Sequence, residues 1–258
     1  MKFVPGIFIL TFLVAPPALA TTVIAPGGAG TAQGTTPLRF YGSGGSRVQQ
    51  IYDASFFAGP SSITSISFRA YPGAAPSGFF SNSVTVSDSL VRLSTSAVSA
   101  NELSGLQPSA IFNANLGADL TTVFSGGFTL TTAATGIGPQ PFDYTLNFTT
   151  AFQYNPAAGN LILDLMIPVG ATVGGGGFGF LTFDNANTLN DGVRSVVDIN
   201  NGGATSGFVD TSAAISAFEV TAVGAIPEPA TWSLMIGGFG LAGAALRGRR
   251  RRAAFSIV

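Results

Sequence analysis

The sequence predicts an all-β protein whose body is an antiparallel β-sandwich, and a jelly roll is one arrangement that fits the pattern. Three observations support this fold class. Short apolar runs alternate with polar residues at a period of two, and clusters of Gly, Pro and Asn separate the runs. No stretch of the body has a long helical period. Only 9% of the 258 residues are charged and 46% are hydrophobic, so the chain has ample material for a core.

The composition excludes several classes of chemistry. The chain contains no His and no Cys, and its only Lys is Lys2. Nucleophile systems that use Cys or a His base, His- or Cys-ligated metals and disulfides are therefore impossible. A Schiff-base Lys and a P-loop Lys are also absent from the body. We expect no cofactor and no enzymatic activity, and only carboxylate chemistry or calcium binding stays open.

The first 20 residues have the order of a secretory signal peptide. Lys2 gives a positive start, residues 3–15 form an apolar run, and Ala18 and Ala20 give the small-residue pattern of a cleavage site before Thr21. An N-terminal buried strand or anchor is the alternative. Residues 21–37, rich in Gly, Pro and Thr, are predicted to form a flexible leader.

Residues 38–224 are predicted to form the β domain. Apolar and polar residues alternate over 142–149, as in a strand with one solvated face. Residues 161–167 are apolar on both faces except at Asp164, which predicts a central strand covered on both sides. Asp164 itself is expected at a strand edge or hydrogen-bonded on the less buried face. Further strands are expected at 47–52, 66–70, 84–86, 90–95, 120–124, 127–132, 178–183, 193–198, 206–210 and 218–222.

One helical turn is expected at residues 99–106, with Ser99 as N-cap and Glu102 completing a capping box. The Gly-rich stretch 174–179 lacks the G-x-G-x-x-G order and a following helix, so we interpret it as a loop rather than a phosphate-binding segment.

The acidic residues of the body are better explained by turns than by catalysis. Most of its eleven Asp and Glu side chains lie near predicted turns or strand ends, where Asp accepts backbone hydrogen bonds. The segments 184–192 and 198–203 are rich in oxygen ligands for calcium, but neither has the EF-hand order, and we interpret them as polar turns. A sugar site would depend on tyrosines, because the only Trp, Trp232, lies near the C-terminus.

The body is acidic, whereas the C-terminal end is basic. Residues 21–226 contain five Arg and eleven Asp and Glu, a net charge of −6, so no nucleic-acid partner is expected. Five arginines follow in a separate C-terminal cluster: Arg247, Arg249, Arg250, Arg251 and Arg252.

The C-terminal segment, residues 225–258, combines three elements in order. Pro227, Glu228 and Pro229 form a stiff, extended element. Residues 230–246 carry no charge and as a helix would reach about 26 Å, which is enough for a thin bilayer. The arginine cluster then favours a cytoplasmic end. The sequence thus predicts a single transmembrane helix with a cytoplasmic basic end and Trp232 at the opposite interface.

This order closely resembles the PEP-CTERM protein-sorting signal, in the variant with a Trp after the PEP element. Here Trp232 precedes the core residues Met235, Ile236, Gly238, Phe239 and Gly240. The resemblance covers residues 225–258 only. It implies a Gram-negative producer, export through the Sec machinery, cleavage by signal peptidase and processing near the PEP element by the membrane-embedded enzyme exosortase. Such producers often make exopolysaccharide and grow as biofilms.

Together these features predict an exported protein that is transiently anchored in the inner membrane and then reaches the cell surface or the medium. We expect a structural or adhesive role there. The alternative is a carbohydrate-binding module for the producer's exopolysaccharide, and a secreted carboxylate hydrolase ranks third. The sequence leaves open whether the tail is cleaved or stays as an anchor.

Overall fold

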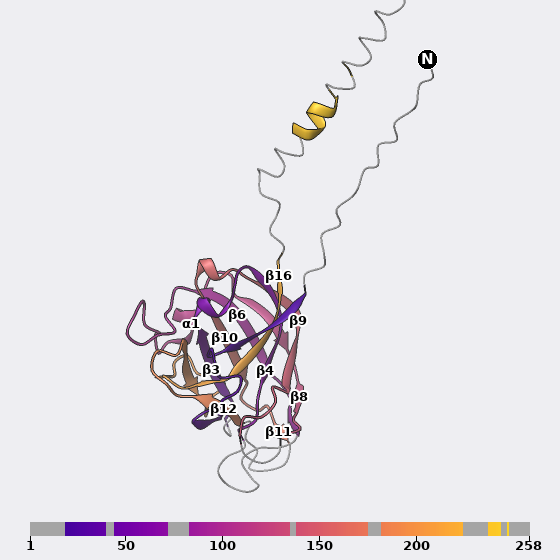
Figure 1. Cartoon of the computed structure of the whole chain (residues 1–258). Coiled ribbons are helices and arrows are strands. Elements are labelled where there is room, and N and C mark those ends of the chain that lie inside the picture. Colours follow the sequence, from indigo (N-terminus) through magenta and orange to yellow (C-terminus); the bar gives the residue numbers. More distant parts are fainter. Residues whose placement is uncertain are drawn as a thin grey trace, which may run out of the picture. The chain divides into compact units, whose positions relative to one another are not determined.

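The computed structural model describes residues 19–39, 44–71, 83–134, 138–174, 182–223, 237–243 and 247. The chain divides into two compact units, Met1–Ala222 and Val223–Val258. The first unit contains the β domain (Figure 1). In the second unit, residues 237–243 are helical and residue 247 is also helical.

The larger of the two main sheets has six strands, all paired in antiparallel fashion. In spatial order these are β14 (Phe208–Asp210), β13 (Val193–Asp198), β3 (Ser46–Tyr52), β10 (Asn160–Ile167), β6 (Leu90–Ser96) and β7 (Thr121–Ser125). Strand β10 pairs with β3 on one side and with β6 on the other, so the apolar run around Asp164 forms a central strand as predicted.

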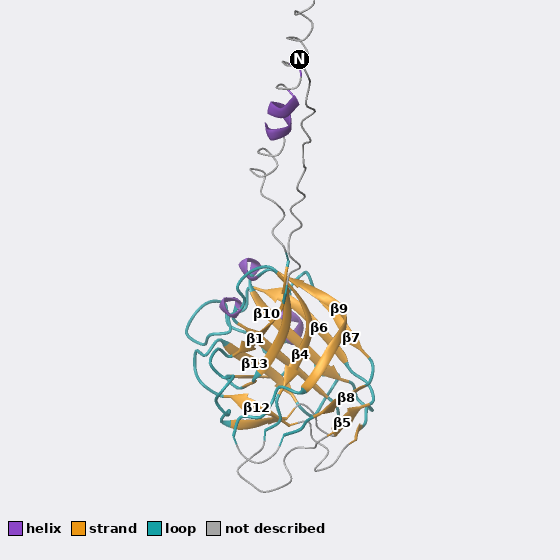
Figure 2. Cartoon of the chain, turned by 45° about the vertical axis from the view of Figure 1, so that its right-hand side comes forward, coloured by secondary structure: helices purple, strands orange, loops and turns teal. Residues whose placement is uncertain are grey.

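The second main sheet has four antiparallel strands. In spatial order these are β1 (Ala20–Ala25), β16 (Ser216–Ala222), β4 (Ser61–Phe68) and β9 (Tyr144–Tyr154). The pairing shifts between Glu219 and Val220 and between Ile63 and Ser65. Figure 2 labels β1, β4 and β9 of this sheet, and β16 lies between β1 and β4.

Two three-stranded sheets complete the β structure. One contains β11 (Val173–Gly174), β5 (Ser83–Val86) and β8 (Phe128–Thr131), and the other contains β15 (Ala213–Ala214), β12 (Thr182–Ala186) and β2 (Thr36–Arg39). The helices of the described body are short: η1 (Ala54–Phe56), α1 (Phe112–Asn115) and η2 (Pro156–Ala158).

The main core lies between the two larger sheets. Tyr52 of β3 and Phe218 of β16 pack edge to face with ring centroids 4.9 Å apart, and both are fully buried. Phe57 contacts Phe218 from the loop that follows η1. Apolar side chains from strands of both sheets therefore share one interior, as in a sandwich. The antiparallel all-β architecture is confirmed, and the jelly-roll order stays a prediction.

The other face of the six-stranded sheet is also covered. Ile51 of β3 and Ile162 of β10 are completely buried against Val98 and Ala100, which belong to the irregular segment after β6. Phe112 of α1 packs with Val196 of β13 further along this face. Strand β10 is buried on both sides, which explains why its sequence is apolar with little alternation.

The segment 21–37 differs from the flexible leader that the sequence predicts. Residues Ala20–Ala25 form β1, which pairs with β16, and Thr36–Arg39 form β2, which pairs with β12. The run Thr21 to Ile24 consists of β-branched residues, which favour strands, and this preference prevails over the surrounding Gly and Pro. The β domain therefore begins at Ala20 rather than at residue 38.

The helical turn expected at residues 99–106 is not formed. The Ser99 hydroxyl accepts a hydrogen bond from Asn101 N at 3.0 Å, while Ser99 N donates to Leu106 O. Because Ser99 N is already paired, the Glu102 carboxylate does not close a capping box. It accepts a bond from Asn190 N instead, 88 residues away. A tertiary contact thus replaces the local one.

Candidate functional site

Most of the predicted sorting residues fall outside the described part of the chain. This holds for Pro227, Glu228, Pro229 and Trp232, for Arg249, Arg250, Arg251 and Arg252, and for Ala18 of the cleavage site. Residues 237–243 of the predicted span are helical and exposed, and Arg247 is helical as well. Among the described residues, no helix has the length and apolar character needed to cross a membrane.

Ala20, the last residue of the predicted signal peptide, is the first residue of β1. It lies opposite Thr221 in the register with β16, and Thr21 lies opposite Val220. The predicted cleavage site is therefore part of a strand at the edge of the four-stranded sheet. Strand β16 ends at Ala222, and the sorting segment follows it in the sequence. Both predicted processing regions are thus attached to neighbouring strands.

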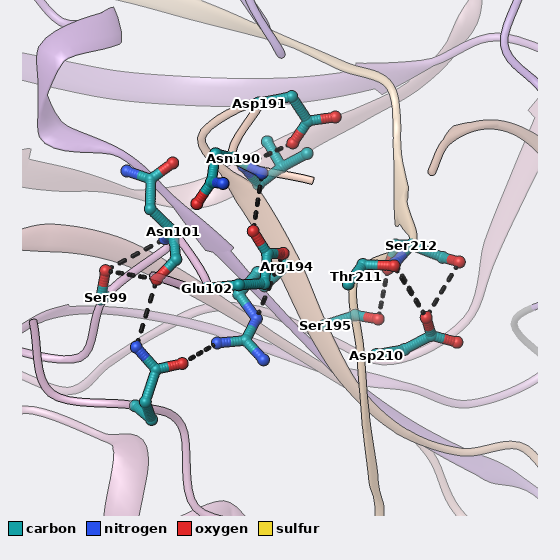
Figure 3. Close-up of polar contacts among 12 residues, drawn as sticks. Ser99, Asn101, Glu102, Asn190, Asp191, Arg194, Ser195, Asp210, Thr211 and Ser212 are labelled. Atoms are coloured by element: carbon teal, nitrogen blue, oxygen red, sulfur yellow. Dashed lines mark hydrogen bonds and ion pairs between the residues drawn. The ribbon is translucent and has the colours of Figure 1, made fainter. Parts of the chain in front are cut away.

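A polar cluster joins the loop after β6 to the turn before β13 (Figure 3). Glu102 Oε2 accepts a hydrogen bond of 2.6 Å from Asn190 N, and Glu102 Oε1 lies 3.6 Å from Arg194 Nε. The Arg194 guanidinium also donates to Gln107 Oε1. Both charged side chains of this ion pair are about nine-tenths buried. The cluster therefore ties two distant segments together through a largely desolvated pair.

Asp191 lies next to this cluster, and its pKa is higher than is usual for an aspartate. Its Oδ1 accepts a hydrogen bond from Val193 N at 3.1 Å, whereas its buried Oδ2 has no partner among the described residues. Desolvation raises the pKa of Asp191 to about 6, and the nearby charge of Glu102 adds to this shift. Glu102 therefore has a cationic partner, whereas Asp191 has none among the described residues.

Two further ion clusters are buried within the sheets. Asp164 accepts hydrogen bonds from Arg47 Nε at 3.0 Å and from Arg92 Nε at 3.0 Å, and it is only 1% exposed. Asp164 was expected at a strand edge or hydrogen-bonded on the less buried face. It is hydrogen-bonded but almost completely buried, because arginines from both flanking strands neutralise it. The single carboxylate with two guanidinium groups is typical of a structural charge network rather than of acid–base catalysis.

The second buried pair fastens the segment between β1 and β2. Arg69 Nε lies 2.6 Å from Asp184 Oδ2, and both side chains are fully buried. Arg69 also donates to the carbonyl oxygens of Ala29 and Ala32, while Asp184 accepts from Gly34 N. Backbone groups thus satisfy the remaining donors and acceptors of the pair, as a buried charge pair requires.

The two segments considered for calcium each begin at the end of a strand and continue into a turn, since residues 184–186 belong to β12 and Asp198 ends β13. Asp184 is engaged by Arg69, and Asp198 Oδ1 accepts bonds from Asn200 N and Asn201 N. Asn201 Oδ1 accepts one from Gly203 N. Within the described ranges, no group of three or more acidic residues is placed to hold a metal ion. The Gly-rich stretch begins at Gly174, which is the last residue of β11. Its remaining residues, 175–179, lie outside the described part of the chain.

Three of the four described tyrosines lie in the core and not on an exposed surface that could stack on a sugar. Tyr52, Tyr144 and Tyr154 are each at most 1% exposed, and burial raises the pKa of all three hydroxyls above the ordinary value of 10. Tyr154 Oη donates to Gly159 O at 2.8 Å, which satisfies its polar end within the fold. Their rings belong to the core.

Sequence reasoning missed the pairing of Glu102, Asp191 and Arg194, because residues almost 90 positions apart meet only after folding. The sequence indicated only that Asp191 belongs to a polar turn, within segment 184–192.

Comparison with known proteins decides the nature of the C-terminal segment. Residues 225–251 match the PEP-CTERM protein-sorting motif. The chain therefore carries a PEP-CTERM protein-sorting motif at its C-terminal end. The motif implies export, exosortase-dependent processing at the membrane and delivery to the cell surface. The matched range includes the PEP element, Trp232 and the first four arginines of the basic cluster. Neither a curated protein nor a solved structure matches the chain.

Proposed function

We propose that this PEP-CTERM protein is a non-enzymatic, structural or adhesive component of the cell surface or extracellular matrix. The motif at residues 225–251 is the observation that carries the proposal, because it assigns the chain to an export route. In this proposal the uncharged segment 230–246 spans the inner membrane of a Gram-negative producer, and exosortase cleaves near Pro227-Glu228-Pro229. The β domain is then released to the surface.

The construction of the β domain supports a passive role. Its described carboxylates mainly hold the fold: Asp119 accepts from Thr95 N, Asp143 from Ala133 N and Asp53 from Ser55 N. Asp164 and Asp184 neutralise buried arginines. A catalytic carboxylate needs a free face toward a substrate, and Asp164 and Asp184 instead use their oxygens inside the protein. Carbohydrate binding ranks second, since three of the tyrosines that could stack on a sugar are buried.

Replacement of the PEP element in the producing bacterium tests the route. We expect the variant Pro227→Ala/Glu228→Ala/Pro229→Ala to accumulate in the inner membrane with its tail attached. The unchanged protein should appear at the surface or in the medium. Thr231→Ser, two residues beyond the element, is the matched control and should be exported normally. Normal surface delivery of the triple variant would contradict exosortase-dependent sorting.

Two experiments with the mature protein then distinguish an adhesive function from a sugar-binding function. Cells that lack the protein should form weaker flocs or biofilms, and added mature protein should restore cohesion. Titration of the mature protein with purified exopolysaccharide from the producer should show millimolar affinity or none. Micromolar binding would favour the carbohydrate-binding alternative, and unchanged cohesion of the deletion strain would argue against an adhesive role.

A further inference from the structure

The end of the sandwich at which β16 finishes is called here the tail-side end, because the sorting segment follows β16 in the sequence. The last residue of β16, Ala222, pairs with Ser61 at the start of β4, and Ser61 pairs with Tyr154 at the end of β9. The short connections 53–60 and 155–159 join β4 and β9 to β3 and β10 of the six-stranded sheet. Strand ends of both main sheets therefore meet at the tail-side end.

Two loops of the six-stranded sheet also leave from the tail-side end. Strand β6 ends opposite Asn160, the first residue of β10, and β13 starts at Val193, opposite the last residue of β3. The segment after β6 and the turn before β13 contact each other there. Leu103 N donates to Asn190 Oδ1 at 3.3 Å, and Glu102 accepts from Asn190 N (Figure 3).

Large exposed apolar side chains are concentrated at the tail-side end. Leu103 is 85% exposed, Leu106 63% and Leu189 66%, and all three lie on these two loops. Leu120 is exposed directly before β7, the antiparallel partner of β6. Leu19 is exposed directly before β1, the antiparallel partner of β16. Five exposed leucines from four segments thus lie at the same end.

The other exposed large apolar side chains in the described part of the first unit lie away from this end. Val169 follows β10 at its far end, and Phe208 pairs with Val197 near the far end of β13. Ile111 lies opposite Ser206, in the segment that leads into β14. Single exposed apolar residues are ordinary, whereas a concentration of them at one end indicates an interaction surface.

The sorting segment limits the distance between the tail-side end and a membrane. Residues 223–229 connect Ala222 to the uncharged segment 230–246, and an extended chain of that length reaches at most about 25 Å. When segment 230–246 spans the membrane, the tail-side end is therefore held close to lipid.

We propose that the exposed leucines of the tail-side end insert into the lipid surface while the chain is anchored. Side chains that protrude from separate segments suit a lipid surface, because lipid needs no matching shape. The acidic residues Asp53, Glu102, Asp119 and Asp191 outnumber Arg194 at this end, so the contact is apolar and favours zwitterionic lipid. This inference rests on the proposed export route, and it adds a lipid-facing surface of the β domain.

Dyes at single cysteines can test this contact, because the chain has no cysteine of its own. The full chain, residues 1–258, is reconstituted in phosphatidylcholine vesicles whose lipids carry a quencher near the headgroup. We expect a polarity-sensitive dye at Leu103→Cys or Leu120→Cys to be quenched at least about twofold. A dye at Val169→Cys, at the far end, should lose less than about 10% of its emission.

Aspartate substitutions distinguish the leucines from the tether alone. Leu106→Asp/Leu189→Asp should reduce the quenching of the dye at Leu120→Cys at least about twofold, because charged side chains avoid the apolar part of the lipid surface. Val169→Asp/Phe208→Asp is the matched control and should leave that quenching unchanged. A dye at Leu241→Cys, within segment 230–246, should report membrane insertion in both variants.

Several outcomes would overturn the inference. One is equal quenching at Val169→Cys and Leu103→Cys, and another is no effect of Leu106→Asp/Leu189→Asp. Quenching that appears only after exosortase is added to the vesicles would assign the surface to a protein partner. Quenching that disappears when each vesicle holds one chain would assign it to a second copy.

The dye at Leu241→Cys distinguishes failure of this inference from failure of the proposed route. If that dye stays outside the membrane, the proposed export route fails and the inference fails with it. If it is inserted while the dye at Leu103→Cys stays in water, only the inference about the leucines fails.

Discussion

Asp164 shows at the scale of a residue how the fold accommodates a charge in its centre. It lies on the central strand β10, and the arginines that neutralise it come from β3 and β6 on either side. The apolar run around it predicted the central strand correctly. Its partners are 117 and 72 residues away in the sequence, so no local pattern could identify them.

The buried pair of Arg69 and Asp184 gives a direct stability prediction. Asp184→Ala would leave the Arg69 guanidinium fully buried without its counter-ion and would remove the acceptor for Gly34 N. We expect the free energy of unfolding to fall by about 3–5 kcal/mol. Urea denaturation of the mature protein measures this. Asp88→Ala, at an exposed position, is the control and should change it by less than about 0.5 kcal/mol. A similar small change for Asp184→Ala would contradict the structural role of the pair.

Asp191 gives a pH-dependent prediction. Because its pKa is raised to about 6 in the folded protein, its ionised form destabilises the fold above that pH. Asp191→Asn keeps the acceptor for Val193 N and removes the charge. Partial solvent screening reduces the effect, so we expect the variant to be more stable by about 1 kcal/mol at pH 7.5. The difference should shrink as the pH falls through 6 and should vanish below about 4.

Urea denaturation of both proteins between pH 4 and 8 provides the test. A difference that stays constant over this range would show that the charge of Asp191 is not the cause.

At the scale of elements, the strength of the local pattern determined which strands could be predicted. The alternation over residues 142–149 overlaps the first half of β9, which begins at Tyr144, and the apolar run at 161–167 falls within β10. Strand β1 was missed because its pattern is short and is followed by Pro26, Gly27 and Gly28. Its partner β16 lies almost 200 positions away, and this long-range pairing gives the segment its structure.

Gly34 tests the packing of the segment between β1 and β2. A Cβ atom there would lie 2.2 Å from Asn185 O and 2.5 Å from Asp184 Oδ1, so backbone would have to move. We expect Gly34→Ala to lower the free energy of unfolding by about 1–3 kcal/mol. A Cβ at Gly59 would meet nothing within 4 Å, so Gly59→Ala is a control for the loss of chain flexibility. Tm values from thermal unfolding provide the test. Equal values for Gly34→Ala and Gly59→Ala would contradict the close packing at Gly34.

At the scale of the whole molecule, the fold depends on packing and buried ion pairs, because the chain has no cysteine and the described residues group no metal ligands. We therefore expect removal of calcium with EDTA to leave the Tm of the mature protein unchanged. Differential scanning calorimetry with and without the chelator checks this. A decrease of more than about 5 °C would indicate a metal site that holds the fold together.

The C-terminal sorting segment was the part of the function that the sequence predicted best. The order of PEP element, Trp232, apolar run and arginines is local, so it is visible without a fold, and the family match at residues 225–251 confirms it. The role of the β domain depends on surfaces that form only after folding. Burial of Tyr52, Tyr144 and Tyr154 is one such property, and the sequence could not distinguish it from exposure.

The intact mass of the native protein from the producing cells and their medium tests the central claim most directly. We predict a chain that starts at Thr21 and ends between residues 226 and 229, and this form has no Trp and therefore no Trp fluorescence. A chain that retains Trp232 and the arginine cluster in a membrane fraction would contradict this account. The tail would then be a permanent anchor, and the protein would act at the inner membrane instead of the cell surface.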